Sequence, residues 1–230
     1  MKRAVRIAGI ILVIILIFAA IITSFNTKPS NTDRIWDQKT TLGNIEAKNY
    51  FIIYSDLVCP YCVAFENAIL EHEDEFRQYI EENDILIEVR LSDFLYEYGE
   101  SNPINSRYSA VATYCAKDEG KFWDYYNLAI KTLWNDYFKK SGKAAFTQIS
   151  KLDKKYWIDL GKKVNLGEEF ASCVESDRPI EEIKEAAKKT SKLVTGLPSF
   201  RLNSYSPPGF SLSGTWEDVK AYFDAGLKSK

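Results

Sequence analysis

The chain has 230 residues, of which 46% are hydrophobic, enough for one sizeable core or one core with an inserted subdomain. Its 30 basic and 32 acidic residues give a net charge of −2, so no basic excess favours nucleic acid as a partner. The chain has one histidine, His72, so a Ser-His-Asp triad or a His-rich metal site could only be built around that residue.

The N-terminus combines three basic residues with a long uncharged segment. Lys2, Arg3 and Arg6 precede residues 7–27, which carry no charge and are long enough to span a bilayer, since roughly 20 apolar residues suffice. This segment ends without a small-x-small cleavage site, which favours an uncleaved signal anchor over a cleaved signal peptide. By the positive-inside rule, residues 1–27 would form a cytoplasmic basic tip and a transmembrane helix, and the rest of the chain would be extracytoplasmic.

A polar linker and a βαβ unit are predicted next. The polar segment "NTKPSNTD" (residues 26–33) breaks both helix and strand, and residues 28–36 are predicted to be a short linker from the membrane. Residues 49–54 form a continuous apolar run, as expected for a central strand buried on both faces. Residues 60–84 have apolar positions at helical spacing, and residues 85–91 alternate like a second strand. The CPYC motif of residues 59–62 would therefore lie at the first strand-to-helix turn.

The second half of the chain is mostly helical. Residues 102–193 keep a helical pattern, and Cys115 and Cys173 each fall on the apolar face of a helix in this block. Two short strands, "GLPSFRLN" and "GFSLSG", are predicted after it, joined by "SYSPP". An amphipathic helix with Thr215 as its N-cap follows. The predicted layout is βαβ, an all-helical insertion, and ββα.

The CPYC motif carries the chemistry. A cysteine at a helix N-terminus is stabilised as the thiolate, because exposed N–H groups and the helix dipole favour negative charge there. Cys59 would occupy this position, with Pro60 in the first helical turn. Cys62, one turn further, would resolve a mixed disulfide formed at Cys59. The two residues between them, Pro60 and Tyr61, would tune the thiolate.

Three other interpretations of the motif are weaker. A zinc site needs a second ligand pair, and the remaining cysteines are single and 58 residues apart, so zinc would require all four cysteines to assemble across domains. A structural disulfide between Cys59 and Cys62 closes too small a loop to stabilise the fold much. Covalent haem attachment needs a histidine after Cys62, where the chain has Val63. A redox pair without metal or organic cofactor is therefore predicted.

Pro198 in "VTGLPSF" precedes a predicted strand. It could be an ordinary trans proline at the start of an edge strand. It could also be a cis proline in a tight turn beside the CPYC motif. There it would keep metal ions off the thiols and present backbone groups to an extended substrate peptide.

Several segments together resemble the DsbA-like thioredoxin-fold family of bacterial thiol:disulfide interchange proteins. The resemblance covers roughly residues 36–228 and rests on "YSDLVCPYCVAF", "ATYCAKDEGKFWDYYNLAI", "EEFASCVESD", "VTGLPSF" and "GFSLSGTWEDVKAYF". It implies an α/β thioredoxin fold in two parts, residues 37–101 and 194–230, interrupted by a helical subdomain at residues 102–193. It also implies that Cys59 and Cys62 are the redox pair and Pro198 is the cis proline.

The sequence departs from the family pattern at three positions. Tyr61 stands where strong oxidases often have histidine, and Leu197 stands where threonine or valine often precedes the cis proline. Ile53 occupies the position of the buried acid that thioredoxin relatives often have. A proton acceptor for Cys62 must then come from elsewhere, with Asp56 or water as the candidates. These departures bear on the redox potential.

Cys115 and Cys173 have two interpretations. They could be buried free thiols that pack as small hydrophobes. The favoured interpretation is a structural disulfide that clamps two helices of the insertion. Such a bridge closes a loop of about 58 residues and would contribute roughly 4 kcal/mol in the chain-entropy model.

These observations predict a membrane-anchored, extracytoplasmic thiol-disulfide oxidoreductase that introduces disulfides into exported proteins. The resemblance implies unfolded or reduced exported proteins as substrates, and a quinone-linked membrane reoxidant of the DsbB or VKOR kind. A reductase or isomerase is the alternative within the enzyme class, although residues 28–48 are too short for the dimerisation domain that such isomerases usually carry. The alternative from another class is a redox-inactive binding or chaperone module at the membrane surface.

Overall fold

The computed structural model describes residues 34–229 of the chain. The predicted signal anchor at residues 1–27 lies outside the described residues, as does most of the predicted linker. None of the helices within residues 34–229 has the length and hydropathy that a bilayer span requires. The chain divides into two units, Met1–Ile35 and Trp36–Lys230, and the second unit contains the fold described below.

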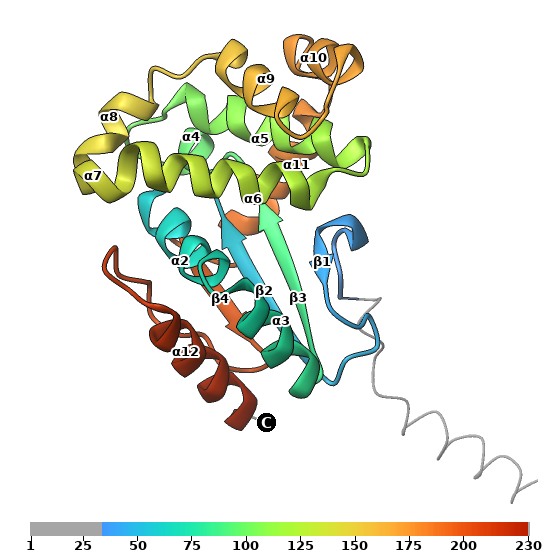
Figure 1. Cartoon of the computed structure of the whole chain (residues 1–230), viewed down its shortest axis with the longest axis vertical. Coiled ribbons are helices and arrows are strands. Elements are labelled where there is room, and N and C mark those ends of the chain that lie inside the picture. Colours follow the sequence, from blue (N-terminus) through green and yellow to red (C-terminus); the bar gives the residue numbers. More distant parts are fainter. Residues whose placement is uncertain (1–33, 230) are drawn as a thin grey trace, which may run out of the picture. The chain divides into compact units, whose positions relative to one another are not determined.

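The described residues contain a four-stranded sheet with the strand order β1-β3-β2-β4 (Figure 1). Strand β2 is parallel to β3 and antiparallel to β4, while β1 is antiparallel to β3. The two central strands are buried along their whole length, which confirms the interpretation of residues 49–54 as an interior strand. The strands are β1 (Thr41–Leu42), β2 (Asn49–Ser55), β3 (Ile85–Leu91) and β4 (Ser199–Leu202).

Two helices connect the parallel strands, α2 (Pro60–Leu70) and α3 (Glu73–Glu82). The chain leaves the helical path at Glu71 and His72, and α3 starts with three acidic residues. Negative side chains in a first turn are stabilised by the partial positive charge of the helix N-terminus, so this composition favours a new helix. The connection confirms the predicted βαβ unit.

A block of helices fills the sequence between β3 and β4 and covers the upper part of the molecule in Figure 1. The long helix α6 continues through a π-helical turn, Trp134–Phe138, into α7. A disulfide between Cys115 and Cys173 joins α5 to α10, with the two Cα atoms 5.9 Å apart. The helices are α4 (Phe94–Tyr98), α5 (Ile104–Asp118), α6 (Phe122–Leu133), α7 (Lys139–Ser141), α8 (Ala145–Ile149), α9 (Lys154–Lys162), α10 (Glu168–Glu175) and α11 (Ile180–Ser191).

The predicted ββα ending was wrong in one element. β4 forms, but residues 209–214 are irregular in the structure. At the end of β4, Leu202 and Tyr205 exchange two backbone hydrogen bonds in an isolated bridge. Pro207 and Pro208 follow and have no N–H to donate, so a ladder cannot continue through them. Phe210 instead enters the core, where its ring lies 5.1 Å from that of Phe65.

The last helix, α12 (Trp216–Lys228), begins where the sequence predicted. Thr215 is its N-cap, and the Asp218 carboxylate accepts a hydrogen bond from the Thr215 backbone N–H at 2.8 Å. This reciprocal capping box fixes the start of the helix. Phe223 of α12 stacks on Phe51 of β2 at 4.7 Å, so α12 covers the same face of the sheet as α2.

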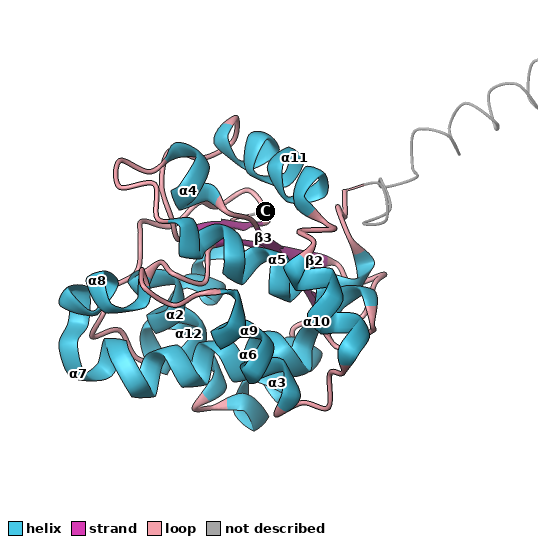
Figure 2. Ribbon diagram, turned by 90° about the horizontal axis from the view of Figure 1, so that it is seen from above, coloured by secondary structure: helices cyan, strands magenta, loops and turns pink. Residues whose placement is uncertain are grey.

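The two faces of the sheet are covered differently, as the view from above shows (Figure 2). Side chains alternate between the faces along a strand. Ile53, Ile87 and Val89 face α2, α3 and α6. Glu88 and Arg90 face the opposite way, toward α11. The active-site cysteines follow β2 at the end of the sheet where β3 also ends and β4 begins.

Candidate active site

Cys59 lies at the N-terminus of α2, where the sequence predicted it. Its extended backbone makes it the N-cap residue, and Pro60 is the first helical residue. Proline fits there because its missing N–H would be unpaired anyway and its fixed φ suits the helix. The N–H of Val63 donates to the Cys59 carbonyl at 3.1 Å and closes the first turn. Cys59 and Cys62 are both free thiols in this structure.

The turn that carries Cys59 is held by Asp56. The buried carboxylate of Asp56 accepts hydrogen bonds from the N–H of Val58 at 3.0 Å, the N–H of Leu95 at 3.0 Å and the hydroxyl of Ser106 at 2.6 Å. Burial raises the pKa of Asp56 to about 6, against the effect of these hydrogen bonds. The side chain therefore ties the active-site turn to α4 and α5.

Cys62 is fully buried, one turn further into α2. Burial raises the pKa of the Cys62 thiol well above its ordinary value, and its hydrogen bond to Cys59 and the nearby charges of Cys59 and Glu66 act in the same direction. A backbone hydrogen bond from Asp56 opposes them. Because a thiolate is costly in this environment, any reaction that releases the Cys62 sulfur needs a proton close by.

Glu66 is a functional candidate that the sequence reasoning missed. It lies one helical turn after Cys62 and is only 5% exposed. Its Oε1 accepts a hydrogen bond from Ser55 Oγ at 2.6 Å, while Oε2 has no hydrogen-bond partner among the described residues. Burial raises the pKa of Glu66 to about 7, although the hydroxyl groups of Ser55 and Tyr126 act to lower it; the Tyr126 hydroxyl donates to Ser55 Oγ at 3.2 Å. Its one sequence signal was an acid inside the otherwise apolar run "CVAFENAIL".

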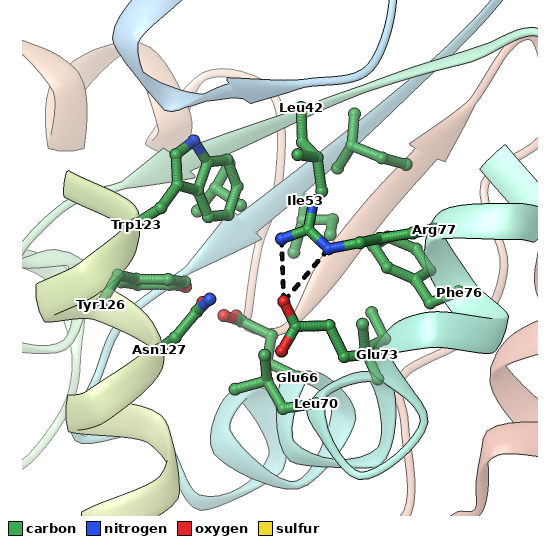
Figure 3. Close-up of a pocket in the computed structure, with 13 residues that line it drawn as sticks. Leu42, Ile53, Glu66, Leu70, Glu73, Phe76, Arg77, Trp123, Tyr126 and Asn127 are labelled. Carbon is green, nitrogen blue, oxygen red and sulfur yellow. Dashed lines mark hydrogen bonds and ion pairs between the residues drawn. The ribbon is translucent and has the colours of Figure 1, made fainter. Parts of the chain in front are cut away.

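Glu66 also lines a cavity of about 50 Å³ between α2, α3, α6 and the sheet (Figure 3). A cavity of this size has room for water, since roughly 10–15 Å³ is enough for one molecule. Figure 3 shows the carboxylate of Glu66 beside Tyr126 and Asn127. An ion pair between Glu73 and Arg77, at 2.8 Å, lies along the same cavity. Most of the other lining residues are apolar, so Asn127 and the Glu73–Arg77 pair are the main polar groups that line this cavity with Glu66.

The loop before β4 meets the thiols from the other side. The peptide bond between Leu197 and Pro198 is cis. The Leu197 carbonyl accepts a hydrogen bond from Cys59 Sγ at 3.6 Å. Ser199 pairs with Tyr54 of β2, which keeps this loop beside the active-site turn. The structure thus brings Cys59, Cys62 and the Leu197–Pro198 loop together.

Tyr61 lies between the two cysteines and is half-buried. Lys143 of the helical block approaches its ring, with Nζ 5.1 Å from the ring centroid. At this distance an ammonium group and an aromatic face attract each other. Tyr61 is therefore in contact with the charge of Lys143, a residue about 80 positions later in the sequence.

The comparisons with known proteins first identify the family. A family model described as thioredoxin matches residues 37–225, so the chain belongs to this thioredoxin family. A comparison with curated proteins found no match. The family match agrees with the fold, in which a βαβ unit carries the CPYC motif at its first turn.

Solved structures then specify the kind of thioredoxin fold. One is reduced DsbG from Mycobacterium tuberculosis, a disulfide bond oxidoreductase, with a TM-score of 0.56 and 18% identity over 88% of this chain and 91% of that chain. Another is MdbA, a thiol-disulfide oxidoreductase from Corynebacterium diphtheriae, with a TM-score of 0.60 and 17% identity over 82% of this chain and 90% of that chain. A third is reduced DsbA from Mycobacterium tuberculosis, with a TM-score of 0.54 and 17% identity over 84% and 95% of the two chains. At these identities the likeness shows the fold, and together with the family match it confirms the predicted DsbA-like thioredoxin-fold class.

Proposed function

We propose that this protein is a membrane-anchored thiol-disulfide oxidoreductase that introduces disulfides into exported proteins outside the cytoplasm. The observation that carries the proposal is the geometry of the cysteine pair. Cys59 starts a helix beside the carbonyl of Leu197, and Cys62 is buried behind it. Cys59 is 4% exposed and Cys62 is 0% exposed, so we assign Cys59 as the sulfur that a substrate attacks and Cys62 as the sulfur that reacts internally.

Oxidation of a substrate would start from the Cys59–Cys62 disulfide. A substrate thiolate attacks Cys59 Sγ, the bond between the two cysteines breaks, and its electron pair leaves on Cys62. A second substrate thiolate then attacks the substrate sulfur of the mixed disulfide and releases Cys59. Two substrate thiols become one disulfide, and the enzyme takes up the two electrons as two thiols.

Glu66 would supply the proton that Cys62 needs in the first step. With a pKa raised to about 7, its carboxyl group can give and take a proton near neutral pH. It is one turn from Cys62, and the nearby Glu66 charge helps to raise the pKa of the Cys62 thiol. Glu66 therefore takes the role expected of Asp56 or water, because the Asp56 carboxylate already accepts three hydrogen bonds in the active-site turn.

The oxidising direction is supported by the compartment that the sequence predicts. A signal anchor would place the domain outside the cytoplasm, where disulfides persist. The structure contains such a disulfide between Cys115 and Cys173, away from the CPYC motif. The reduced enzyme would be reoxidised by a quinone-linked membrane protein of the DsbB or VKOR kind.

The equilibrium reduction potential of the Cys59–Cys62 pair tests the direction. The full-length protein in detergent would be equilibrated with glutathione buffers, and thiols would be counted after acid quenching. An oxidase is expected to lie well above the potential of thioredoxin, which is about −270 mV. A value at that level would instead make the protein a reductase.

A Cys59→Ala variant separates an enzyme from a redox-inactive chaperone module. Loss of disulfide formation in exported proteins is expected, because the variant lacks the sulfur that substrates attack. Unchanged disulfide formation in cells would support the binding module. Membrane anchoring needs its own measurement, namely retention of the intact chain in the membrane fraction after carbonate washing and its digestion by protease added outside the cell.

A further inference from the structure

Three lysines follow the π-helical turn that packs against α2: Lys139, Lys140 and Lys143. All three side chains belong to exposed residues. Residues 134–146 contain one acid, Asp136, and therefore carry a net charge of +2. The ion pairs among the described residues involve other lysines, such as Lys131 and Lys154, so the charge of this cluster is not neutralised.

The fold brings one of these charges, that of Lys143, to the active site. α7 ends at Gly142, whose φ of 52° lies in the region that glycine adopts without steric cost. The chain turns there, and Lys143 comes to lie over the ring of Tyr61, at 5.1 Å. The π-helical turn that leads into α7 is the part of this segment that packs against α2, and Figure 1 shows α7 at the far end of the long helix that starts with α6. We call the three lysines Lys139, Lys140 and Lys143 the basic lip.

Near the turn held by Asp56, on the other side of the active-site end, two carboxylates share one cation and leave a net negative charge. There, Asp93 and Glu97 of the α4 region both pair with Arg107. Tyr61 lies two residues after Cys59 in α2, so the charge of Lys143 over its ring is close to the residue that a substrate thiolate attacks. Exposed charges at the edge of a contact change association rates and partner choice more than they change affinity.

We propose that the basic lip, with Lys143 as its central residue, selects substrates whose reactive cysteine is flanked by aspartate or glutamate. The inference rests on the proposed function, because it concerns the choice among substrate thiols that attack Cys59. Its partner class is an extended acidic peptide segment around a cysteine. The positive charge would draw such a segment toward Tyr61 and hold it while the mixed disulfide forms.

The test uses three dithiol peptides of identical sequence except for the residues that flank the cysteines, which are Glu, Gln or Lys. Stopped-flow measurements would give the rate constant for reduction of the oxidised full-length enzyme by each peptide at low ionic strength. Flanking charges also change the pKa of the peptide thiol, so the readout is the Glu-to-Lys rate ratio of each variant relative to wild type. This relative ratio cancels the intrinsic reactivity of the peptide.

Lys143→Gln is expected to lower the Glu-to-Lys ratio about two- to fivefold, the size of a single exposed charge interaction. Lys143→Arg keeps the charge and should restore the wild-type ratio. The effect should shrink in about 1 M salt, where screening acts within roughly 3 Å. Lys228→Gln is the matched control, since Lys228 is exposed on α12, next to the end of β4 that lies away from Cys59.

The peptide with Gln beside its cysteines separates the proposed substrate selection from the proposed oxidoreductase function. If wild type reacts with it and Lys143→Gln leaves the Glu-to-Lys ratio unchanged, as Lys228→Gln does, the basic lip has no role in selection. A ratio that falls in the Gln variant and does not return in Lys143→Arg contradicts a charge effect in the same way. A wild-type enzyme that oxidises none of the three peptides contradicts the proposed function itself.

Discussion

Two glutamates are buried against the same sheet, on opposite faces, and only one of them has a compensating cation. Glu66 on α2 has one hydrogen bond to Ser55 and one oxygen without a partner among the described residues. Glu88 on β3 is 0% exposed and pairs with Arg90 at 2.7 Å. A buried charge is costly unless it is paired and hydrogen-bonded, so the two sites have opposite energetics.

The surroundings of Glu88 explain what that site does. Its Oε1 accepts hydrogen bonds from the backbone N–H groups of Trp36 at 2.5 Å and Asp37 at 3.1 Å. Tyr50 donates its hydroxyl to Oε2, and the guanidinium of Arg90 lies 4.1 Å from the ring of Trp36. These hydrogen bonds hold Trp36 and Asp37, the first residues of the unit Trp36–Lys230, against β3. Full compensation at Glu88 thus serves structure, whereas Glu66 has no cation and burial raises its pKa to about 7.

The largest expected effect comes from breaking the compensated site. Glu88→Ala should lower the free energy of unfolding by about 3–5 kcal/mol, because Arg90 would remain as an uncompensated buried charge. Urea unfolding of the detergent-solubilised full-length chain, followed by tryptophan fluorescence, measures this loss. Glu182→Ala is the control, since its half-exposed carboxylate pairs with Lys117 at the rim of the network and should cost less than about 1 kcal/mol. Equal losses in the two variants would contradict the distinction.

Glu66, the buried glutamate without a cation, should make the free energy of unfolding depend on pH. The pKa of Glu66 is raised from 4.5 to about 7, so the folded state holds its proton more tightly than the unfolded state. The stability that protonated Glu66 contributes is fully present below pH 4.5 and is lost as the pH rises through about 7. The loss in the free energy of unfolding amounts to about 3 kcal/mol. Glu66→Gln should remove this part of the pH dependence.

Asp56 provides the internal check on that experiment. Burial also raises the pKa of Asp56, to about 6, and Asp56 itself is still present in the Glu66→Gln variant. The variant should therefore keep the loss of stability that Asp56 causes as the pH rises through about 6. The difference in unfolding free energy between variant and wild type should grow between pH 5 and 8, and a constant difference would show that Glu66 does not titrate there.

Glu66 should matter for rate as well as for stability. At pH 6, Glu66→Gln is expected to slow disulfide transfer to a dithiol peptide about tenfold or more, because Cys62 loses its proton donor. The ratio of wild-type to variant rates should fall as the pH rises through about 7, where Glu66 loses its proton. Glu73→Gln is the control, since Glu73 lines the same cavity but pairs with Arg77. A similar loss in both variants would point to a general effect on the cavity.

The sequence predicted the parts of this site that depend on local pattern. The apolar run of β2, the helix start at Pro60 and the N-cap at Thr215 follow from short-range chemistry, and the structure confirms them. The strand over residues 209–214 was wrong because Pro207 and Pro208 interrupt the ladder and Phe210 packs into the core.

The two buried glutamates could not be placed from the sequence. Glu88 and Arg90 alternate with apolar residues in "ILIEVRL", a pattern that also fits a solvent-exposed face. That face is covered by α11, which lies about 100 residues later in the chain. Glu66 gave only the weak signal of one acid in an apolar helix. Which buried acid has a cation depends on tertiary contacts, and no single-sequence pattern encodes them.

The smallest expected effect comes from Tyr126, which can sharpen the role of Glu66 without removing it. The Tyr126 hydroxyl, which donates to Ser55 Oγ at 3.2 Å, lowers the pKa of Glu66, so Tyr126→Phe should raise this pKa further. The midpoint of the pH-dependent rate should then move to higher pH, with a loss of about 1 kcal/mol in stability from the missing hydrogen bond. Tyr125→Phe is a matched control, because its buried hydroxyl donates to the Trp157 carbonyl at 3.1 Å, outside the Glu66 site. Both variants should lose similar stability, and only Tyr126→Phe should move the midpoint. A shift in both, or in neither, would mean that Glu66 does not set the pH dependence of the reaction.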